Sequence, residues 1–185
     1  MSEFLTVEGL SHVAIRTHNI MDSVRYYTEV LGMREAFRMC REDGTLATVY
    51  LSIAPGQFLE VFADGVREGI TGPDVIGINH ICLMTKDVRK SYDAVLAADG
   101  PLDSEVKRGQ SQCWMFWTHD PDGTQIEIME MPPESMQAQA DKKLWANSIQ
   151  DNESAYTTNQ KKNASGFCRR TEQFRRTGFM LPDSE

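Results

Sequence analysis

The chain has 185 residues, 41% of them hydrophobic and 25% charged, which is enough for one globular domain with a tail. The 27 Asp and Glu residues outnumber the 19 Lys and Arg residues, and the resulting net charge of −8 disfavours nucleic acid as a partner. No hydrophobic run approaches the roughly 20 residues of a membrane span, so we expect no membrane binding either.

The four cysteines are spread along the chain without a C-x-x-C spacing, which is typical of free thiols in a reducing compartment. The first residues are acidic and lack the positively charged segment of a signal peptide. Both features predict a cytoplasmic protein, and the negative charge favours a small molecule as its substrate.

The first 63 residues alternate between strand and helix signals. Residues 9–16 predict a strand, Asn19 offers a helix N-cap, and Gly32 offers a helix stop before a strand at 33–41. Turn signals at 42–44 and 55–56 separate two further strands, at 45–53 and 57–63. The predicted order is therefore β-α-β-β-β.

A Gly-rich linker at 64–76 leads to a second series in the same order. Strands are expected at 77–85, 103–108, 112–118 and 124–131, and a helix at 87–98 with Val88, Tyr92, Val95 and Leu96 facing inward. We therefore predict an α+β fold of two tandem β-α-β-β-β modules, at 8–63 and 77–131, in one domain spanning 8–131.

Residues 132–185 form a C-terminal extension rich in Asn and Gln, with one predicted helix at 136–149. The rest is expected to be either disordered or an arm that wraps a partner. Its basic pairs, at 161–162, 169–170 and 175–176, are interpreted as solvated surface or, alternatively, as contacts to an anionic partner.

Two His–Glu pairs occupy equivalent places in the two modules. Residue n aligned with residue n+68 places His12 on His80, and Glu60 and Glu127 follow in the last strand of each module. Strand alternation turns each glutamate away from its aliphatic neighbours, where an unpaired carboxylate would be costly to bury. One divalent metal ion (Ni²⁺, Zn²⁺, Mn²⁺, Fe²⁺ or Co²⁺) shared by the four side chains would remove that cost.

Two segments resemble known signatures. Residues 19–33 look like the first helix of the vicinal oxygen chelate superfamily, and residues 120–127 look like its closing strand. The resemblance covers about residues 8–131 and implies curved, cup-like mixed sheets around a metal, often in a homodimer. The ligand set His12, Glu60, His80 and Glu127 is similar to that of bacterial glyoxalase I (lactoylglutathione lyase).

That resemblance implies a metal-dependent lyase or isomerase acting on an α-hydroxycarbonyl or hemithioacetal through an enediolate. Glu127 is the expected base, with Glu60 on the opposite side of the metal. Arg16 matches an arginine that glyoxalase I uses on glutathione, and Lys107 or Arg108 lies near a glutathione-binding lysine. A glutathione adduct is therefore the candidate substrate.

Four features depart from glyoxalase I. Asp64 stands where that family has an asparagine that contacts glutathione, residues 72–79 before His80 do not closely match, and the long tail is atypical. The strand around Trp114, Phe116 and Trp117 is unusually aromatic. These rings are expected either to pack in the core or, for Trp114 and Phe116, to line the substrate cup.

Alternative functions stay open at this point. The chain is interpreted either as a glyoxalase I-like enzyme or as another metal-dependent epimerase, isomerase or dioxygenase of the superfamily. A third interpretation is a metal-free binding protein of the resistance type. The four intact ligands count against this third alternative.

Overall fold

A computed structural model of the protein describes residues 9–67, 76–145 and 179–180. These residues belong to two compact units, of which the first contains 9–67 with 179–180 and the second contains 76–145. The predictions for most of the linker, for the basic pairs and for Cys168 lie outside the described residues. No helix in the described ranges is long and apolar enough to cross a bilayer.

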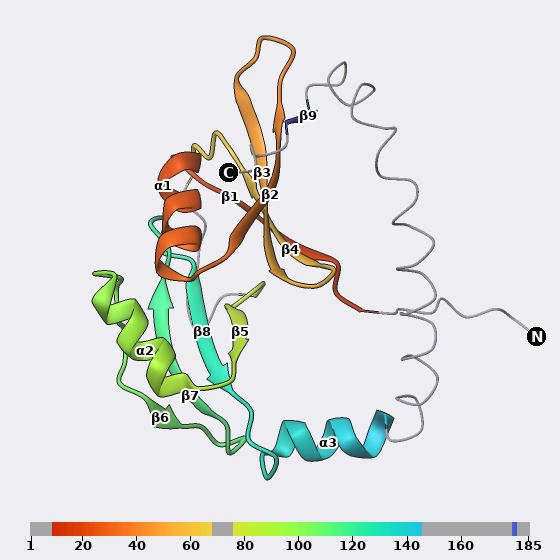
Figure 1. Cartoon of the computed structure of the whole chain (residues 1–185), viewed down its shortest axis with the longest axis vertical. Coiled ribbons are helices and arrows are strands. Elements are labelled where there is room, and N and C mark those ends of the chain that lie inside the picture. The colour runs from red at the N-terminus through yellow and green to blue at the C-terminus, as the bar shows by residue number, and fades with distance from the viewer. Residues whose placement is uncertain (1–8, 68–75, 146–178, 181–185) are drawn as a thin grey trace, which may run out of the picture. The chain divides into compact units, whose positions relative to one another are not determined.

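The first unit has the predicted β-α-β-β-β order (Figure 1). Its strands lie in the order β1-β4-β3-β2-β9, and only β1 and β4 are parallel within this mixed sheet. The elements are β1 (His12–Arg16), α1 (Ile20–Arg25), a π-helical turn η1 (Tyr26–Val30), β2 (Arg34–Cys40), β3 (Leu46–Ala54), β4 (Gln57–Phe62) and β9 (Phe179–Met180). The sequence did not predict η1 or β9.

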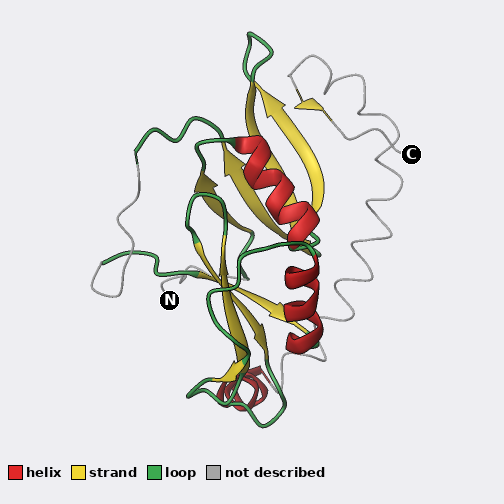
Figure 2. Cartoon of the chain, turned by 90° about the vertical axis from the view of Figure 1, so that its left-hand side faces the viewer, coloured by secondary structure: helices red, strands yellow, loops and turns green. Residues whose placement is uncertain are grey.

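The core of the first unit lies between α1–η1 and one face of the sheet (Figure 2). Val49 and Leu51 of β3 and Leu59 and Val61 of β4 are fully buried there, as is Tyr27 of η1. Because side chains alternate along a strand, the residues between them, among them Glu60, lie on the opposite face.

The second unit repeats the order β-α-β-β-β and adds a helix. Its mixed sheet runs β5-β8-β7-β6, again with only the first two strands parallel. The elements are β5 (Ile81–Thr85), α2 (Val88–Ala97), β6 (Lys107–Arg108), β7 (Trp114–His119), β8 (Gln125–Glu130) and α3 (Met136–Trp145). The expected fold class is thus confirmed in each unit, with one sheet per module.

Two predicted strands are shorter than expected. The strand predicted at 103–108 is reduced to Lys107–Arg108, because the hydroxyl of Ser104 accepts the backbone N–H of Trp117 (3.1 Å) in place of a backbone carbonyl. The strand predicted at 77–85 begins at Ile81, so His80 lies one residue before β5.

The core of the second unit lies between α2 and the sheet. Val88 and Val95 of α2 are buried, and Tyr92 packs edge-on against the fully buried Phe116 (5.3 Å between ring centroids). The prediction that Leu96 faces inward is wrong, since its side chain is exposed. Val88 and Val95 are two helical turns apart, and Leu96 falls about 100° around the helix from that buried stripe.

The sequence repeat recurs in hydrogen bonds at the start of each helix. In the first unit Thr17 Oγ1 bonds to Ser23 Oγ (2.6 Å), and in the second unit Thr85 Oγ1 bonds to Ser91 Oγ (2.7 Å). Each pair ties the end of the module's first strand to the helix that follows. The 68-residue offset therefore holds in three dimensions as well as in sequence.

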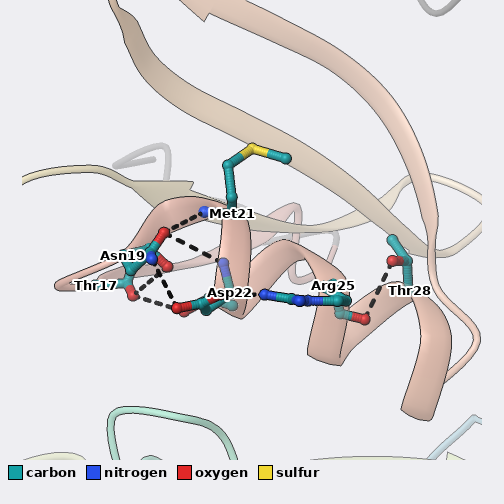
Figure 3. A network of polar contacts seen from close by, with 7 residues as sticks. Thr17, Asn19, Met21, Asp22, Arg25 and Thr28 are labelled. Carbon is teal, nitrogen blue, oxygen red and sulfur yellow. Dashed lines mark hydrogen bonds and ion pairs between the residues drawn. The ribbon is translucent and has the colours of Figure 1, made fainter.

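Each helix also begins with a side-chain cap at the same offset. Asn19 Oδ1 accepts the backbone N–H groups of Met21 and Asp22 at 3.1 and 3.4 Å (Figure 3). Asp87 Oδ1 accepts the N–H of Lys90 at 3.0 Å. These bonds satisfy amides that a helix start leaves unpaired, which fixes where the chain turns from strand to helix.

Candidate metal centre

The first His–Glu pair is formed by neighbouring parallel strands. The register of β1 on β4 pairs His12 with Phe58 and Ala14 with Glu60, so the imidazole and the carboxylate lie on the same face of the sheet. His12 Nε2 lies 3.5 Å from Glu60 Oε2. Glu60 is 7% exposed, whereas His12 is largely accessible.

The second oxygen of Glu60 has its own partner. Tyr50 stands directly opposite Glu60 in the antiparallel pairing of β3 and β4, and its hydroxyl donates to Glu60 Oε1 (2.6 Å). Burial and the neighbouring carboxylate raise the pKa of Tyr50 to about 12. The phenol therefore keeps its proton at neutral pH and serves as a permanent donor.

The second His–Glu pair lies in the other unit. His80 Nε2 is 3.1 Å from Glu127 Oε2, and His80 Nδ1 is 2.8 Å from Asn79 Oδ1. Because an amide oxygen can only accept, the contact with Asn79 is a hydrogen bond when Nδ1 carries the proton. On a neutral ring, Nε2 then presents its lone pair towards the carboxylate.

The surroundings of Glu127 differ from those of Glu60. Trp117 stands opposite Glu127 in β7, and its ring meets His80 edge-on at 4.8 Å. Cys82 pairs with Glu127 from β5. Burial, with a smaller contribution from Glu127, raises the pKa of the Cys82 thiol to about 12, so the thiol stays protonated.

The donor chemistry of both pairs fits a cation. Two acceptors that face each other at 3.1 Å, as His80 and Glu127 do on a neutral ring, repel unless a proton or a cation satisfies both. Imidazole and carboxylate are also the ligands that divalent transition metals accept. Among the described residues, no group of three or more His, Cys, Asp and Glu side chains lies close enough together to hold a metal ion, and each unit contains one facing His–Glu pair.

Two predicted substrate-binding residues of the first unit are bound to other parts of the chain. Arg16 donates to the carbonyl oxygen of Ala63 (2.7 Å), and its guanidinium lies over the ring of Phe62. Asp64 follows at φ 63° and forms an exposed ion pair with Arg41, a residue that the sequence did not suggest. Arg41 thus offsets the negative charge of Asp64, the residue that differs from the asparagine expected from the resemblance to glyoxalase I.

Phe116 and Trp114 of the second unit lie on the face away from Glu127. Phe116 pairs with Ile128 and is fully buried, which supports its alternative role in the core. Trp114 lies on the same face as Phe116, with the guanidinium of Arg89, from α2, 5.8 Å from its ring centroid. The two rings therefore lie on the face away from Glu127, and the burial of Phe116 agrees with the core alternative.

Lys107 is exposed on the edge strand β6, where its backbone pairs with Met115. Its neighbour Arg108 is held by Glu134 and by the ring of Trp114. Of the two candidates for an anion contact, Lys107 is thus the one for which no side-chain partner is found among the described residues.

Three residues beside the pairs were not predicted: Tyr50, Asn79 and Trp117. Asn79 precedes His80, so its adjacency was visible in the sequence. Tyr50 faces Glu60 because of a register shift between Ser52 and Ala54, which the sequence does not reveal. Trp117 could have been found from its odd spacing to Trp114, which puts the two rings on opposite faces.

Comparison with known proteins places this arrangement in a family. Residues 9–128 match the model of the Glyoxalase/Bleomycin resistance protein/Dioxygenase superfamily. The chain belongs to this superfamily, and the predicted resemblance to vicinal oxygen chelate proteins is confirmed. The match covers both units and all four residues of the His–Glu pairs.

Individual relatives are more distant. A putative lactoylglutathione lyase of Brassica oleracea var. gemmifera is 27% identical over 126 residues, which cover 66% of this chain and 44% of that protein. The chain thus spans less than half the length of this relative. The uncharacterized protein YwbC of Bacillus subtilis (strain 168) is 25% identical over 123 residues, which cover 65% of this chain and 96% of that protein.

Among solved structures, the glyoxalase family protein from Enterococcus faecalis is similar in fold. Its TM-score is 0.58 at 21% sequence identity, over 66% of this chain and 98% of that chain. At this level of identity the likeness supports the fold of the two modules and not a particular reaction.

Proposed function

We propose that the protein is a metal-dependent lyase or isomerase similar to glyoxalase I. The observation that carries this proposal is the presence of a facing His–Glu pair at the equivalent place of each module, His12 with Glu60 and His80 with Glu127. A carboxylate at position 60 is the feature that the sequence resemblance associates with isomerases rather than with dioxygenases.

His12, Glu60, His80 and Glu127 are the proposed ligands of one divalent metal ion. When bound, such an ion would act as a Lewis acid on a substrate oxygen and increase the acidity of the adjacent C–H group. Asn79 holds Nδ1 of His80 and so keeps its Nε2 turned towards Glu127. Tyr50 likewise fixes the orientation of the Glu60 carboxylate by donating its hydroxyl to Oε1.

Glu127 is the proposed base. It would take a proton from one carbon of an α-hydroxycarbonyl or hemithioacetal and return it to the neighbouring carbon. Its side chain is 13% exposed, which limits exchange of that proton with bulk water. Trp117, on the same face of the sheet, replaces Trp114 and Phe116 as the proposed aromatic wall beside it.

A glutathione hemithioacetal is the proposed substrate. Arg16 and Lys107 are the proposed contacts for its carboxylates, and their positive charge complements the anion. The ion pair between Asp64 and Arg41 supports this choice, because it offsets the negative charge that would otherwise repel the tripeptide.

Two measurements test the proposal. The purified full chain is expected to bind about one divalent metal ion per polypeptide and to convert the methylglyoxal–glutathione hemithioacetal. His12→Ala and His80→Ala are each expected to weaken metal binding. The control Cys113→Ala, which truncates a side chain in the core, is expected to leave metal binding unchanged. A protein that binds no metal would instead belong with the metal-free binding members of the superfamily. A protein that binds metal but does not turn over this substrate would have a different isomerisation substrate.

A further inference from the structure

Glu60 is almost fully buried and has both carboxylate oxygens directed at named partners. Oε2 faces His12 Nε2 at 3.5 Å, and Oε1 accepts the hydroxyl of Tyr50 at 2.6 Å. Since the hydroxyl occupies Oε1, only Oε2 remains available beside the imidazole.

We propose that Tyr50 is a positioning residue that fixes Glu60 as a metal-ligating carboxylate and leaves proton transfer to Glu127. This inference rests on the proposed function of the two pairs. It assigns different tasks to two glutamates that look equivalent in the sequence, and it assigns them from the donors that each carboxylate meets.

The tyrosine ring is itself held in place. Phe37 of β2 stacks on it, with 4.4 Å between ring centroids and 20° between planes. Phe58 and His12 meet the same ring edge-on at 6.3 and 6.1 Å. A hydroxyl on a ring packed from three sides has little freedom, so the orientation of the carboxylate is set before any ligand arrives.

Among the described residues, no hydroxyl like that of Tyr50 donates to Glu127, whose thiol neighbour Cys82 is the weaker donor. The residue directly opposite it is Trp117, whose ring contacts His80, and no hydrogen bond between Trp117 and Glu127 is found in the described part of the chain. The other neighbour, Cys82, offers a thiol, which is a weak donor. Glu127 is therefore freer than Glu60 to accept and release a proton.

The variant Tyr50→Phe tests the inference, because it removes the hydroxyl and keeps the ring that stacks on Phe37. Zn²⁺ binding to the metal-free full chain would be measured by titration calorimetry. Loss of an outer partner of a metal ligand typically weakens metal binding by about 10–100-fold, and that loss is expected here. Tyr92→Phe is the matched control, because it removes a hydroxyl from a ring packed on Phe116, and it should bind Zn²⁺ like the wild type.

A second measurement needs no metal. Thermal unfolding of the metal-free protein would be compared for Tyr50→Phe, Glu60→Leu and the double variant. Because the two side chains share one bond, their effects should be non-additive, with Tyr50→Phe lowering the midpoint by about 2–4 °C only when Glu60 is present. Additive effects would show that the bond does not hold Glu60, and would overturn the inference.

The outcomes separate this inference from the function on which it rests. If the wild type binds Zn²⁺ and Tyr50→Phe binds it within about twofold, the positioning role is wrong and the metal site stands. If the wild type binds no divalent metal, the proposed function fails and the positioning role fails with it. Weakened Zn²⁺ binding together with non-additive unfolding supports the inference.

Discussion

The two units have the same frame and different surroundings for the same pair of residues. In both, a hydroxyl pair ties the first strand to a capped helix, and both bring a histidine in or just before that strand together with a glutamate of the neighbouring parallel strand. On the glutamate face of the first unit the neighbours are Tyr50, Phe37 and Phe58. In the second they are Trp117 and the sulfur-containing side chains of Cys82, Met115 and Met129.

This difference shows which parts of the fold tolerate divergence. The caps and hydroxyl pairs stabilise the turn from strand to helix, and they recur at the same place in both modules. The residues opposite the glutamates, Tyr50 and Trp117, do not form these turns and can differ between the modules. They determine how firmly each carboxylate is held. Variants made in equivalent places of the two units therefore test whether the glutamates have separate roles.

The largest expected effect is the loss of the base. Glu127→Gln keeps the shape of the side chain and removes its ability to take a proton, so kcat is expected to fall by about 10²–10⁴-fold. Activity would be measured at saturating metal, with metal content and thermal unfolding recorded for the same sample. Glu60→Gln, the matched variant, is expected to lose mainly metal affinity. Full activity in Glu127→Gln would contradict the assignment.

The next largest effect is a difference in unfolding free energy between variants on the helix-covered face of one sheet and on the glutamate face of the other. Phe116→Ala removes a fully buried ring from the core of the second unit and is expected to cost about 3–5 kcal/mol. Phe37→Ala removes a partly buried ring from the glutamate face of the first unit and should cost clearly less. Urea unfolding measures both, and equal costs would argue that the two faces are equally buried.

The helix caps provide a smaller effect with a defined pH dependence. Asn19→Ala is expected to cost about 1 kcal/mol at every pH, because the amide does not titrate. Hydrogen bonds from Lys90 hold the pKa of Asp87 below its usual value of 3.8. The charged cap therefore stabilises the fold above that value and loses its effect as the pH falls through the lowered pKa.

Asp87→Asn isolates the titrating part of that cap. Unfolding of the wild type and of this variant would be followed by circular dichroism near neutral pH and in acid. The difference between the two proteins should shrink in acid, whereas the difference caused by Asn19→Ala should persist. An Asp87 effect that does not change with pH would mean that the carboxylate does not act as a charged cap.

The smallest expected effect concerns the end of β4. Asp64→Asn removes a negative charge, and asparagine tolerates the positive φ found there. A unit charge about 4 Å away in water is worth about 1 kcal/mol, so KM for the glutathione hemithioacetal should fall by at most about fivefold. Arg41→Gln leaves Asp64 unpaired and should raise KM instead. No change in either variant would place this ion pair away from the substrate.

The sequence was enough to predict both modules because their signals are local. Asn19 and Asp87 cap helices, Gly32 ends the first of them at φ 69°, and the turn after Asp120 follows from its side chain accepting the amides of Asp122 and Thr124. Side-chain alternation likewise predicted that the glutamates face away from the aliphatic core. Each of these features depends on a few consecutive residues.

The errors occurred where distant segments meet. Ser104 ends a predicted strand early by bonding to Trp117, and β9 pairs with β2 from the far end of the chain. The sequence also left open whether Trp114 and Phe116 pack in the core or line the substrate cup, because their aromatic character fits both environments. Because Trp117 directly follows Phe116, strand alternation places its ring on the opposite face, which is the face of Glu127.

The sequence by itself determined the two modules, their βαβββ order and the two His–Glu pairs, because the pattern repeats at a fixed offset. In each module the glutamate lies in the strand beside the one that contains or directly follows the histidine. Only the tertiary structure decided that Tyr50 reaches Glu60. A two-residue turn at Pro55–Gly56 counted without irregularity would set Leu51 opposite Glu60, and the register shift between Ser52 and Ala54 moves Tyr50 there instead. This shift of one residue pairs Leu51 with Leu59 and places the hydroxyl of Tyr50 at the carboxylate of Glu60. The sequence could therefore predict the pair of His12 and Glu60 but not the hydrogen bond from Tyr50.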